Sequence, residues 1–280
     1  MRELRSQAGL SRRAMNVPFA PSIAILTLVQ ASLIALPART TLPIASRLAN
    51  RWWALVLPGS IVVVIAGIAL DPGLADGLTY LALVAVPLLA ALALAMAVRG
   101  ARPLLALLVV PLFVLAFGVG GLTGQAAALA LSALACVALG SLVASLVPPR
   151  WLGLAIYAMA AIDTCLVAAD LLQNPNQILE AAAPAAGLPQ LQFAQFGSAV
   201  IGFGDFFIAA VLGALLAGNR PLQLRTAVLV AGLAFVFDLL FFFVAELPST
   251  VPVAVGLAIL ELRDSSSRRA RSRDPRAAVA

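Results

Sequence analysis

The sequence contains no histidine and no lysine, and only 11% of its 280 residues are charged. Without histidine the chain cannot use an imidazole as a general base, form a Ser-His-Asp triad or build the usual zinc sites. Its two cysteines, Cys136 and Cys165, lie far apart in apolar stretches, so neither a disulfide framework nor a metal-binding spacing is visible. We therefore expect no metal site and no cofactor.

The scarcity of charge also excludes a soluble globular protein. Average soluble chains carry roughly a quarter charged residues, whereas 62% of this chain is hydrophobic. So few polar groups would leave large apolar areas open to water. Each crossing of a bilayer takes about 20 apolar residues, so nine crossings would use about 180. The composition predicts an all-α, multi-pass membrane protein without a sizeable soluble domain.

Hydropathy along the chain predicts nine transmembrane helices. They cover residues 19–37, 53–70, 77–98, 103–120, 124–147, 151–173, 196–217, 225–246 and 248–262. The prolines and amide side chains of residues 174–195 indicate a loop, with room for one short interfacial helix. We divide the chain into a basic N-terminal segment, 1–18, a first group of helices, 19–147, a second group, 148–262, and a disordered arginine-rich tail, 263–280.

The positions of the arginines predict the orientation. All 18 basic residues are arginine. Fourteen of them occupy the loops after the first, third, fifth and seventh predicted helices and the C-terminal tail, whereas the loops on the other side contain no arginine and include the acidic residues Asp71, Asp76, Glu180 and Glu246. By the positive-inside rule, the C-terminus is cytoplasmic and the N-terminus lies outside. Arginines before the first helix oppose this orientation, and either translation from Met15 or removal of a signal peptide would eliminate them.

The net charge of +6 is explained by this topology and by contact with anionic lipid headgroups. No RNA-binding or DNA-binding motif accompanies the charge, so we expect no nucleic-acid partner. Exclusive use of arginine, with abundant alanine and leucine, is compatible with a GC-rich prokaryote. The expected location is therefore the cytoplasmic membrane of a prokaryote.

Ionisable side chains inside predicted transmembrane helices are costly and are candidates for function. Counting about 1.5 Å per helical residue, Asp163 lies about 18 Å beyond Trp151, and Asp205 lies about 14 Å beyond Phe196. In adjacent antiparallel helices, both acids would lie near the midplane of the bilayer. The aspartates within predicted spans are Asp163, Asp170, Asp205 and Asp238.

Two carboxyl groups that approach within hydrogen-bonding distance cannot both ionise easily, so they share a proton. One can accept a proton from water while the other donates one to a peptide carbonyl oxygen. We therefore predict that Asp163 and Asp205 are catalytic. Asp170, near a helix end, is expected to be solvated, and Asp238 is expected to be either a buried, hydrogen-bonded acid or a group that lines a cavity.

The most specific local pattern is GxGD, in which Gly202, Phe203 and Gly204 precede Asp205. Glycines at this spacing permit close helix packing, or a local opening of the helix through which a substrate backbone reaches the acid. A second acid occurs one helix earlier, and a proline-flanked segment, LPSTVPVAVGLA, begins the last predicted helix.

In this order, the features resemble the presenilin and signal peptide peptidase family of GxGD intramembrane aspartyl proteases. The resemblance covers about residues 157–262, roughly 40% of the chain. It implies a presenilin-like fold in which Asp163 and Asp205 are the catalytic acids. It also implies substrate-binding residues beside them, namely Gly202, Phe203, Gly204, Pro248, Ser249, Thr250, Val251 and Pro252.

Two features depart from the family pattern. Ile162 precedes Asp163 where the family has tyrosine, and the nearest tyrosine is Tyr157. Of the family's PAL motif, only the prolines and their position remain, at Pro248 and Pro252. The first departure concerns a catalytic motif and the second a substrate-binding motif.

The function predicted is hydrolysis of peptide bonds within transmembrane helices, with membrane-protein segments as substrates and lipids as surroundings. We expect residues 248–252 to pair with an extended substrate as a strand-like edge. One alternative is a prepilin peptidase, which also uses GxGD but usually follows it with a lysine, whereas Phe206 and Phe207 follow it here. Another is a transporter whose acids bind protons or cations. A third is an inactive member of the family that only binds transmembrane helices.

Overall fold

The structure is a computed structural model that describes residues 17–40, 47–185, 188–244 and 247–272, with side chains described as far as residue 263. Most of the basic N-terminal segment, with Met15, and the last eight residues of the tail lie outside these ranges. The helices are α2 (Phe19–Ala35), α4 (Val56–Leu70), α5 (Gly73–Leu92), α6 (Val109–Gly118), α7 (Gly121–Leu146), α8 (Pro149–Ala168), α9 (Gln173–Ala181), α10 (Phe203–Leu215), α11 (Arg220–Asp238) and α12 (Val251–Ser272).

Short helical segments extend several of these helices. They are the 3-10 turns η2 (Arg51–Leu55), η4 (Pro103–Leu108) and η5 (Leu239–Phe242) and the π-helical turn η3 (Ala93–Ala97). Two strands, β1 (Phe193–Phe196) and β2 (Ala199–Gly202), form an antiparallel hairpin. The described chain is therefore largely helical, with one small sheet immediately before α10.

Within the described residues, five helices are long and apolar enough to cross a membrane, by length and composition. They are Arg51–Leu70, Gly73–Ala97, Gly121–Leu146, Pro149–Ala168 and Arg220–Phe242, and shorter apolar helices cover Phe19–Ala35, Pro103–Gly118 and Phe203–Leu215. Large apolar side chains such as Leu70, Val228 and Phe242 remain more than 70% exposed. Such surfaces are unfavourable in water and favourable in lipid, which indicates a membrane protein.

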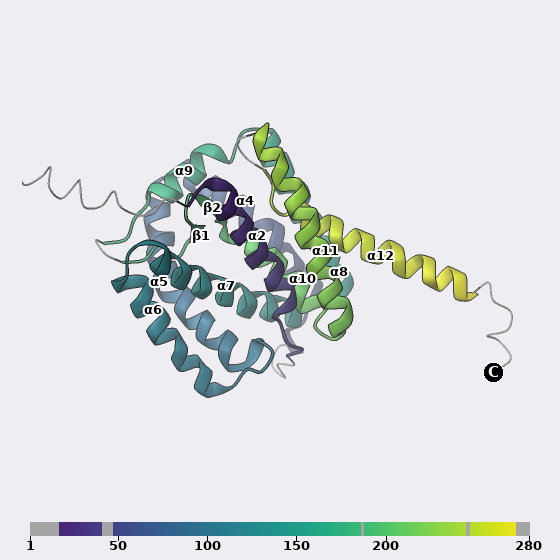
Figure 1. The fold of residues 1–280 in the computed structure, drawn as a ribbon. Helices are drawn as coiled ribbons and strands as arrows, with labels where there is room; N and C mark the ends of the chain where they lie inside the picture. Colours follow the sequence, from purple (N-terminus) through teal and green to yellow (C-terminus); the bar gives the residue numbers. More distant parts are fainter. Residues whose placement is uncertain (1–16, 41–46, 186–187, 245–246, 273–280) are drawn as a thin grey trace, which may run out of the picture.

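The centre of the fold is α7, which packs against α5, α6, α10 and β1 (Figure 1). At Gly140 of α7, an added Cβ would lie 2.8 Å from the backbone carbon of Ala210 in α10. At Gly213 of α10, it would lie 2.6 Å from the backbone oxygen of Ile34 in α2. Small residues thus let α10 lie in backbone contact with two neighbours, and this packing fixes the helix that carries Asp205.

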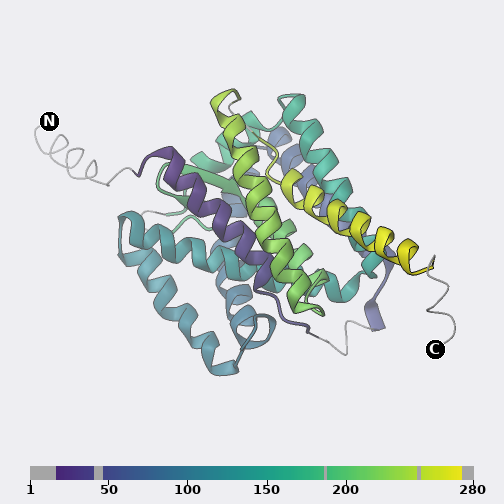
Figure 2. The same cartoon turned by 45° about the vertical axis from the view of Figure 1, so that its right-hand side comes forward.

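On the other side, α11 lies beside both α2 and α12, and α12 projects away from the helical body (Figures 1 and 2). The side chain of Gln223 in α11 is fully buried and forms hydrogen bonds to several separate segments of the chain. Its Nε2 donates to the carbonyl oxygens of Pro37 at 3.0 Å and Gly213 at 2.9 Å. Its Oε1 accepts from Arg99 at 2.8 Å and Arg220 at 3.2 Å. These bonds tie α10 and α11 to the chain just after α2.

The prediction of one continuous helix over residues 196–217 is wrong. Residues 193–202 form the hairpin, whose turn contains Gly197 at φ 60° and Ser198, and α10 begins only at Phe203. A two-residue turn of this kind matches the twist of the flanking strands. The acid Asp205 consequently lies in the first turn of α10, and a helix count from Phe196 does not measure its depth.

The predicted loop at 174–195 does contain one short helix, α9. The predicted ninth helix ends at residue 262, whereas α12 continues to Ser272. Part of the segment assigned to a disordered tail is therefore helical. Its sequence contains no proline or glycine before that point, so nothing interrupts a helix started by the preceding apolar residues.

Candidate active site

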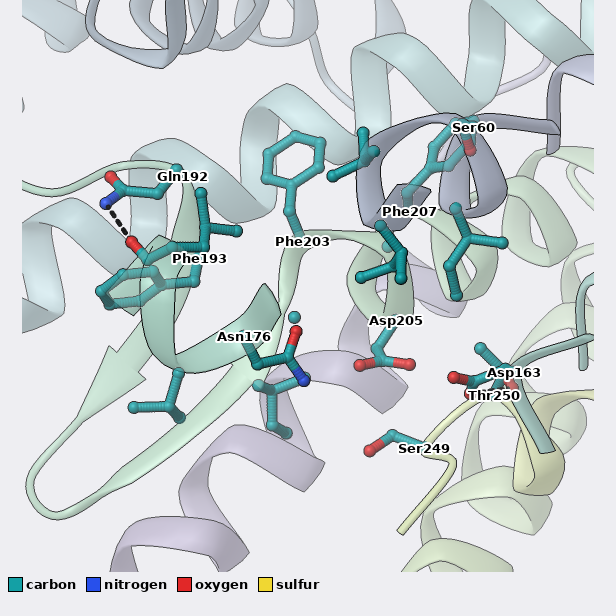
Figure 3. Close-up of a pocket in the computed structure, with 18 of the residues that line it drawn as sticks. Ser60, Asp163, Asn176, Gln192, Phe193, Phe203, Asp205, Phe207, Ser249 and Thr250 are labelled. Carbon is teal, nitrogen blue, oxygen red and sulfur yellow. Dashed lines mark hydrogen bonds between the residues drawn. The ribbon is translucent and has the colours of Figure 1, made fainter. Parts of the chain in front are cut away.

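The carboxyl groups of Asp163 and Asp205 face each other across one end of a cavity of about 670 Å³ (Figure 3). Asp163 lies five residues before the end of α8, and Asp205 is the third residue of α10. Their carboxyl groups are close enough for their charges to interact. Packing of α8 against α10 thus brings together two acids that are 42 positions apart in the chain.

Asp163 is held by the segment just before α12. The Thr250 hydroxyl donates a hydrogen bond of 2.6 Å to Oδ2 of Asp163, and the backbone N–H of Thr250 also points to this carboxyl group. Both side chains are at least 95% buried. Two donors from one residue fix the orientation of the Asp163 carboxyl group, which a single bond would leave free to rotate.

Asp205 is held by the residues of its own GxGD motif. The backbone N–H of Gly202 points to the Asp205 carboxyl group. A Cβ at Gly202 would lie 3.1 Å from Oδ2 of Asp205, and a Cβ at Gly204 would lie 3.3 Å from Cε of Met159 in α8. Glycine at these two positions therefore keeps space beside the carboxyl group and lets α10 approach α8.

The rest of the cavity is mostly apolar. Side chains of α4 and α5 form one wall. The hairpin and α9 close the end opposite Asp163, and Asn176 and Gln192 are among the polar residues there (Figure 3). Glu180 of α9 also lines this cavity, and partial burial raises the pKa of its carboxyl group. An apolar cavity with two acids at one end suits an apolar ligand that carries one reactive polar group.

The structure brings most of the predicted site residues into this cavity. Its lining includes Asp163, Gly202, Phe203, Gly204, Asp205, Ser249 and Thr250. The other three do not line it: Pro248 and Pro252 are buried elsewhere, and Val251 and Pro252 already belong to the first turn of α12. Residues 251 and 252 are therefore helical and cannot form the strand-like edge predicted from the sequence.

The other acids of the predicted helices lie outside the cavity lining. Asp170 is exposed and adopts a positive φ of 56° just after α8, as a residue at a helix end does. Asp238 accepts a 2.7 Å hydrogen bond from the buried Thr27, which joins α11 to α2. The exposed helix-end position expected for Asp170 agrees with the structure; Asp238 makes the expected hydrogen bond, but its side chain is half-buried and does not line the cavity.

Tyr157, the tyrosine nearest to Asp163 in sequence, bonds to a different acid. Its hydroxyl donates to Oε2 of Glu261 at 3.0 Å, which joins α8 to α12.

In the described parts of the chain, no group of three or more cysteine, aspartate or glutamate side chains is placed to hold a metal ion.

The sequence analysis missed Gln30, which lies in the middle of α2 and is only 3% exposed. Its Nε2 donates to the carbonyl oxygen of Asp205 at 3.2 Å and to that of Ser249 at 3.1 Å. The signal that could have identified it is an amide side chain in an otherwise apolar helix, since such groups in membrane helices usually form hydrogen bonds between helices.

No protein-family model, no curated protein and no solved structure matches the chain.

Proposed function

We propose that the chain is an intramembrane aspartyl protease of the GxGD type, similar to presenilin and signal peptide peptidase. It would hydrolyse a peptide bond in a transmembrane helix with Asp163, Asp205 and one water molecule. The observation that carries the proposal is that two carboxyl groups from different helices face each other at one end of an apolar cavity. This arrangement supports the proposal, because an apolar peptide bound in the cavity would have its backbone beside both acids.

The chemistry follows from sharing one proton between the two carboxyl groups. The ionised carboxylate accepts a proton from water as the water oxygen bonds to the carbonyl carbon, and the protonated carboxyl donates to the carbonyl oxygen. The C–N bond then breaks as the nitrogen takes up a proton. Donors from Thr250 and Gly202 keep the two carboxyl groups oriented during these transfers.

A transmembrane helix hides its carbonyl groups in its own hydrogen bonds, so a substrate must become extended before it is cleaved. The β1–β2 hairpin ends at Gly202, three residues before Asp205, and Phe193, Val200 and Ile201 line the cavity. A two-stranded hairpin has unpaired edges that can bond to an added strand. We therefore assign the strand-pairing role to this hairpin instead of residues 248–252.

The finer membrane topology also belongs to the proposal. The three shorter apolar helices and the apolar first half of α12 would complete nine crossings with the five long ones. From Asp205 to the end of α10 at Leu215 there is about 15 Å of helix, half of a bilayer core of about 30 Å. With the arginine-bearing loops in the cytoplasm, the acid pair would lie deep in the membrane and the C-terminus inside.

The test is cleavage by the purified protein in liposomes that contain a labelled single-span peptide. We expect two fragments whose new ends, located by mass spectrometry, lie within the hydrophobic span. Cleavage only at the cytoplasmic border of the span would favour a prepilin-type peptidase. An intact peptide, together with proton or cation flux across the same liposomes, would favour a transporter and contradict the proposal.

A further inference from the structure

We propose that Gln30 is a positioning residue for the two acids, one that acts by tying α10 to the segment before α12. The inference rests on the proposed protease function and adds to it a residue from the N-terminal part of the chain. Gln30 does not line the cavity, so it would not touch the substrate and is not itself catalytic.

The geometry of the amide supports this role. A primary amide has two N–H donors, and Nε2 of Gln30 donates to two carbonyl oxygens, at 3.2 Å on Asp205 and 3.1 Å on Ser249. The first carbonyl belongs to a catalytic acid of α10. The second belongs to the residue next to Thr250. One side chain of α2 thus fixes the spacing between two separate backbone segments.

The link continues to the second acid. The hydroxyl of Thr250 donates to Asp163 at 2.6 Å, and the backbone N–H of Thr250 points to the same carboxyl group. The backbone of Asp205 is therefore joined, through Gln30, Ser249 and Thr250, to the carboxyl group of Asp163. Movement of residues 249–250 relative to α10 would change the separation of the two carboxyl groups, and Gln30 opposes that movement.

The burial of the Gln30 side chain is evidence that its amide group serves the site. Gln30 shares α2 with the fully buried Leu26, Leu33 and Ile34, and an apolar side chain would suit this packing. Burying an amide is unfavourable unless its hydrogen bonds are made. Both donors here serve the active-site backbone, so the requirement for glutamine comes from the site more than from the packing of α2.

We expect Gln30→Leu to lower kcat by about 10- to 100-fold, because sub-ångström to 1 Å errors in the placement of reacting groups have effects of this size. KM should change less than about twofold, since the residue is not in the cavity. The matched control is Thr27→Val, which removes another buried hydrogen bond of α2, to Asp238, outside the site. Both variants should lower the unfolding temperature, and only Gln30→Leu should lower kcat per folded molecule.

Gln30→Glu provides a readout that a purely structural role would not produce. An ionised carboxylate has no donor for the two carbonyl oxygens, whereas a protonated carboxyl has one. The ratio of kcat for this variant to kcat for the wild type should therefore rise as the pH falls. If Gln30→Leu does not fold, the pH dependence of kcat for Gln30→Glu still tests the positioning role.

The outcomes separate this inference from the proposed function. If the wild type does not cleave, or if Asp205→Asn cleaves equally well, the protease function itself is wrong. If the wild type cleaves and Asp205→Asn does not, but Gln30→Leu keeps the kcat of Thr27→Val, the positioning role is wrong and the function stands. A flat pH ratio for Gln30→Glu would also overturn the positioning role.

Discussion

Replacing Asp205 with asparagine is expected to lower the cleavage rate by about 10³- to 10⁴-fold, because the amide can neither accept nor release the proton that hydrolysis requires. Asp163→Asn should have an effect of similar size. The two acids act as a unit, so the double variant should be no slower than the slower single variant. The shape of the side chain is conserved in each case, and the packing around the cavity should therefore survive.

The measurement is the rate of fragment formation per folded molecule in liposomes. Asp170→Asn is the matched control, since this acid is also near the end of α8 but is exposed and outside the cavity. Its activity should stay within about twofold of the wild type. Substantial cleavage by Asp205→Asn, or effects of the two substitutions that multiply, would show that the acids do not work together.

Thr250→Val is expected to lower kcat by about 10- to 100-fold. Valine keeps the size and branching of threonine but removes the hydroxyl that donates to Asp163 at 2.6 Å. A donor to a buried carboxylate is worth more than an ordinary hydrogen bond, because water cannot replace it there. The carboxyl group would keep the backbone N–H of Thr250 and lose the second point that fixes its orientation.

Thr250→Ser restores a hydroxyl at the same position and should recover most of the activity. Thr226→Val is a control for the loss of a buried threonine hydroxyl, since Thr226 is fully buried in α11 and donates only within that helix, to Leu222 at 2.7 Å. Equal rates for Thr250→Val and Thr226→Val would mean that the hydroxyl of Thr250 has no part in catalysis.

The acids of the candidate site could be found from the sequence because charged side chains are conspicuous in apolar segments. Asp163 and Asp205 stand out for this reason, and the GxGD pattern adds a local geometric argument for Asp205. That they meet in one cavity depends on the packing of α8 and α10, which no local pattern contains.

The hairpin could have been predicted from its turn. Gly197 and Ser198 lie between two short segments rich in aromatic and β-branched residues, a typical hairpin pattern. Continuous hydropathy from residue 196 to residue 217 concealed it, because an apolar strand and an apolar helix have the same mean hydropathy. The error moved the start of the helix by seven residues and invalidated the depth count for Asp205.

The partners of Gln30 and the individual role of Thr250 could not be predicted from the sequence. Gln30 is 175 residues from Asp205 in the sequence, and its two acceptors are backbone oxygens, which any residue provides. Thr250 was identified only as part of a proline-flanked segment. Its bond to Asp163 depends on the tertiary packing of α12 against α8.

The most direct test of the central claim, that Asp163 and Asp205 meet in one cavity, is cross-linking of cysteines placed at these two positions. In a background of Cys136→Ala and Cys165→Ala, a short thiol cross-linker should join positions 163 and 205 within one molecule in the membrane, as identified by mass spectrometry of the linked peptides. A control pair at 170 and 205 should link far more slowly. Equal linking of the two pairs, or linking of 163 to 205 only between molecules, would contradict the claim.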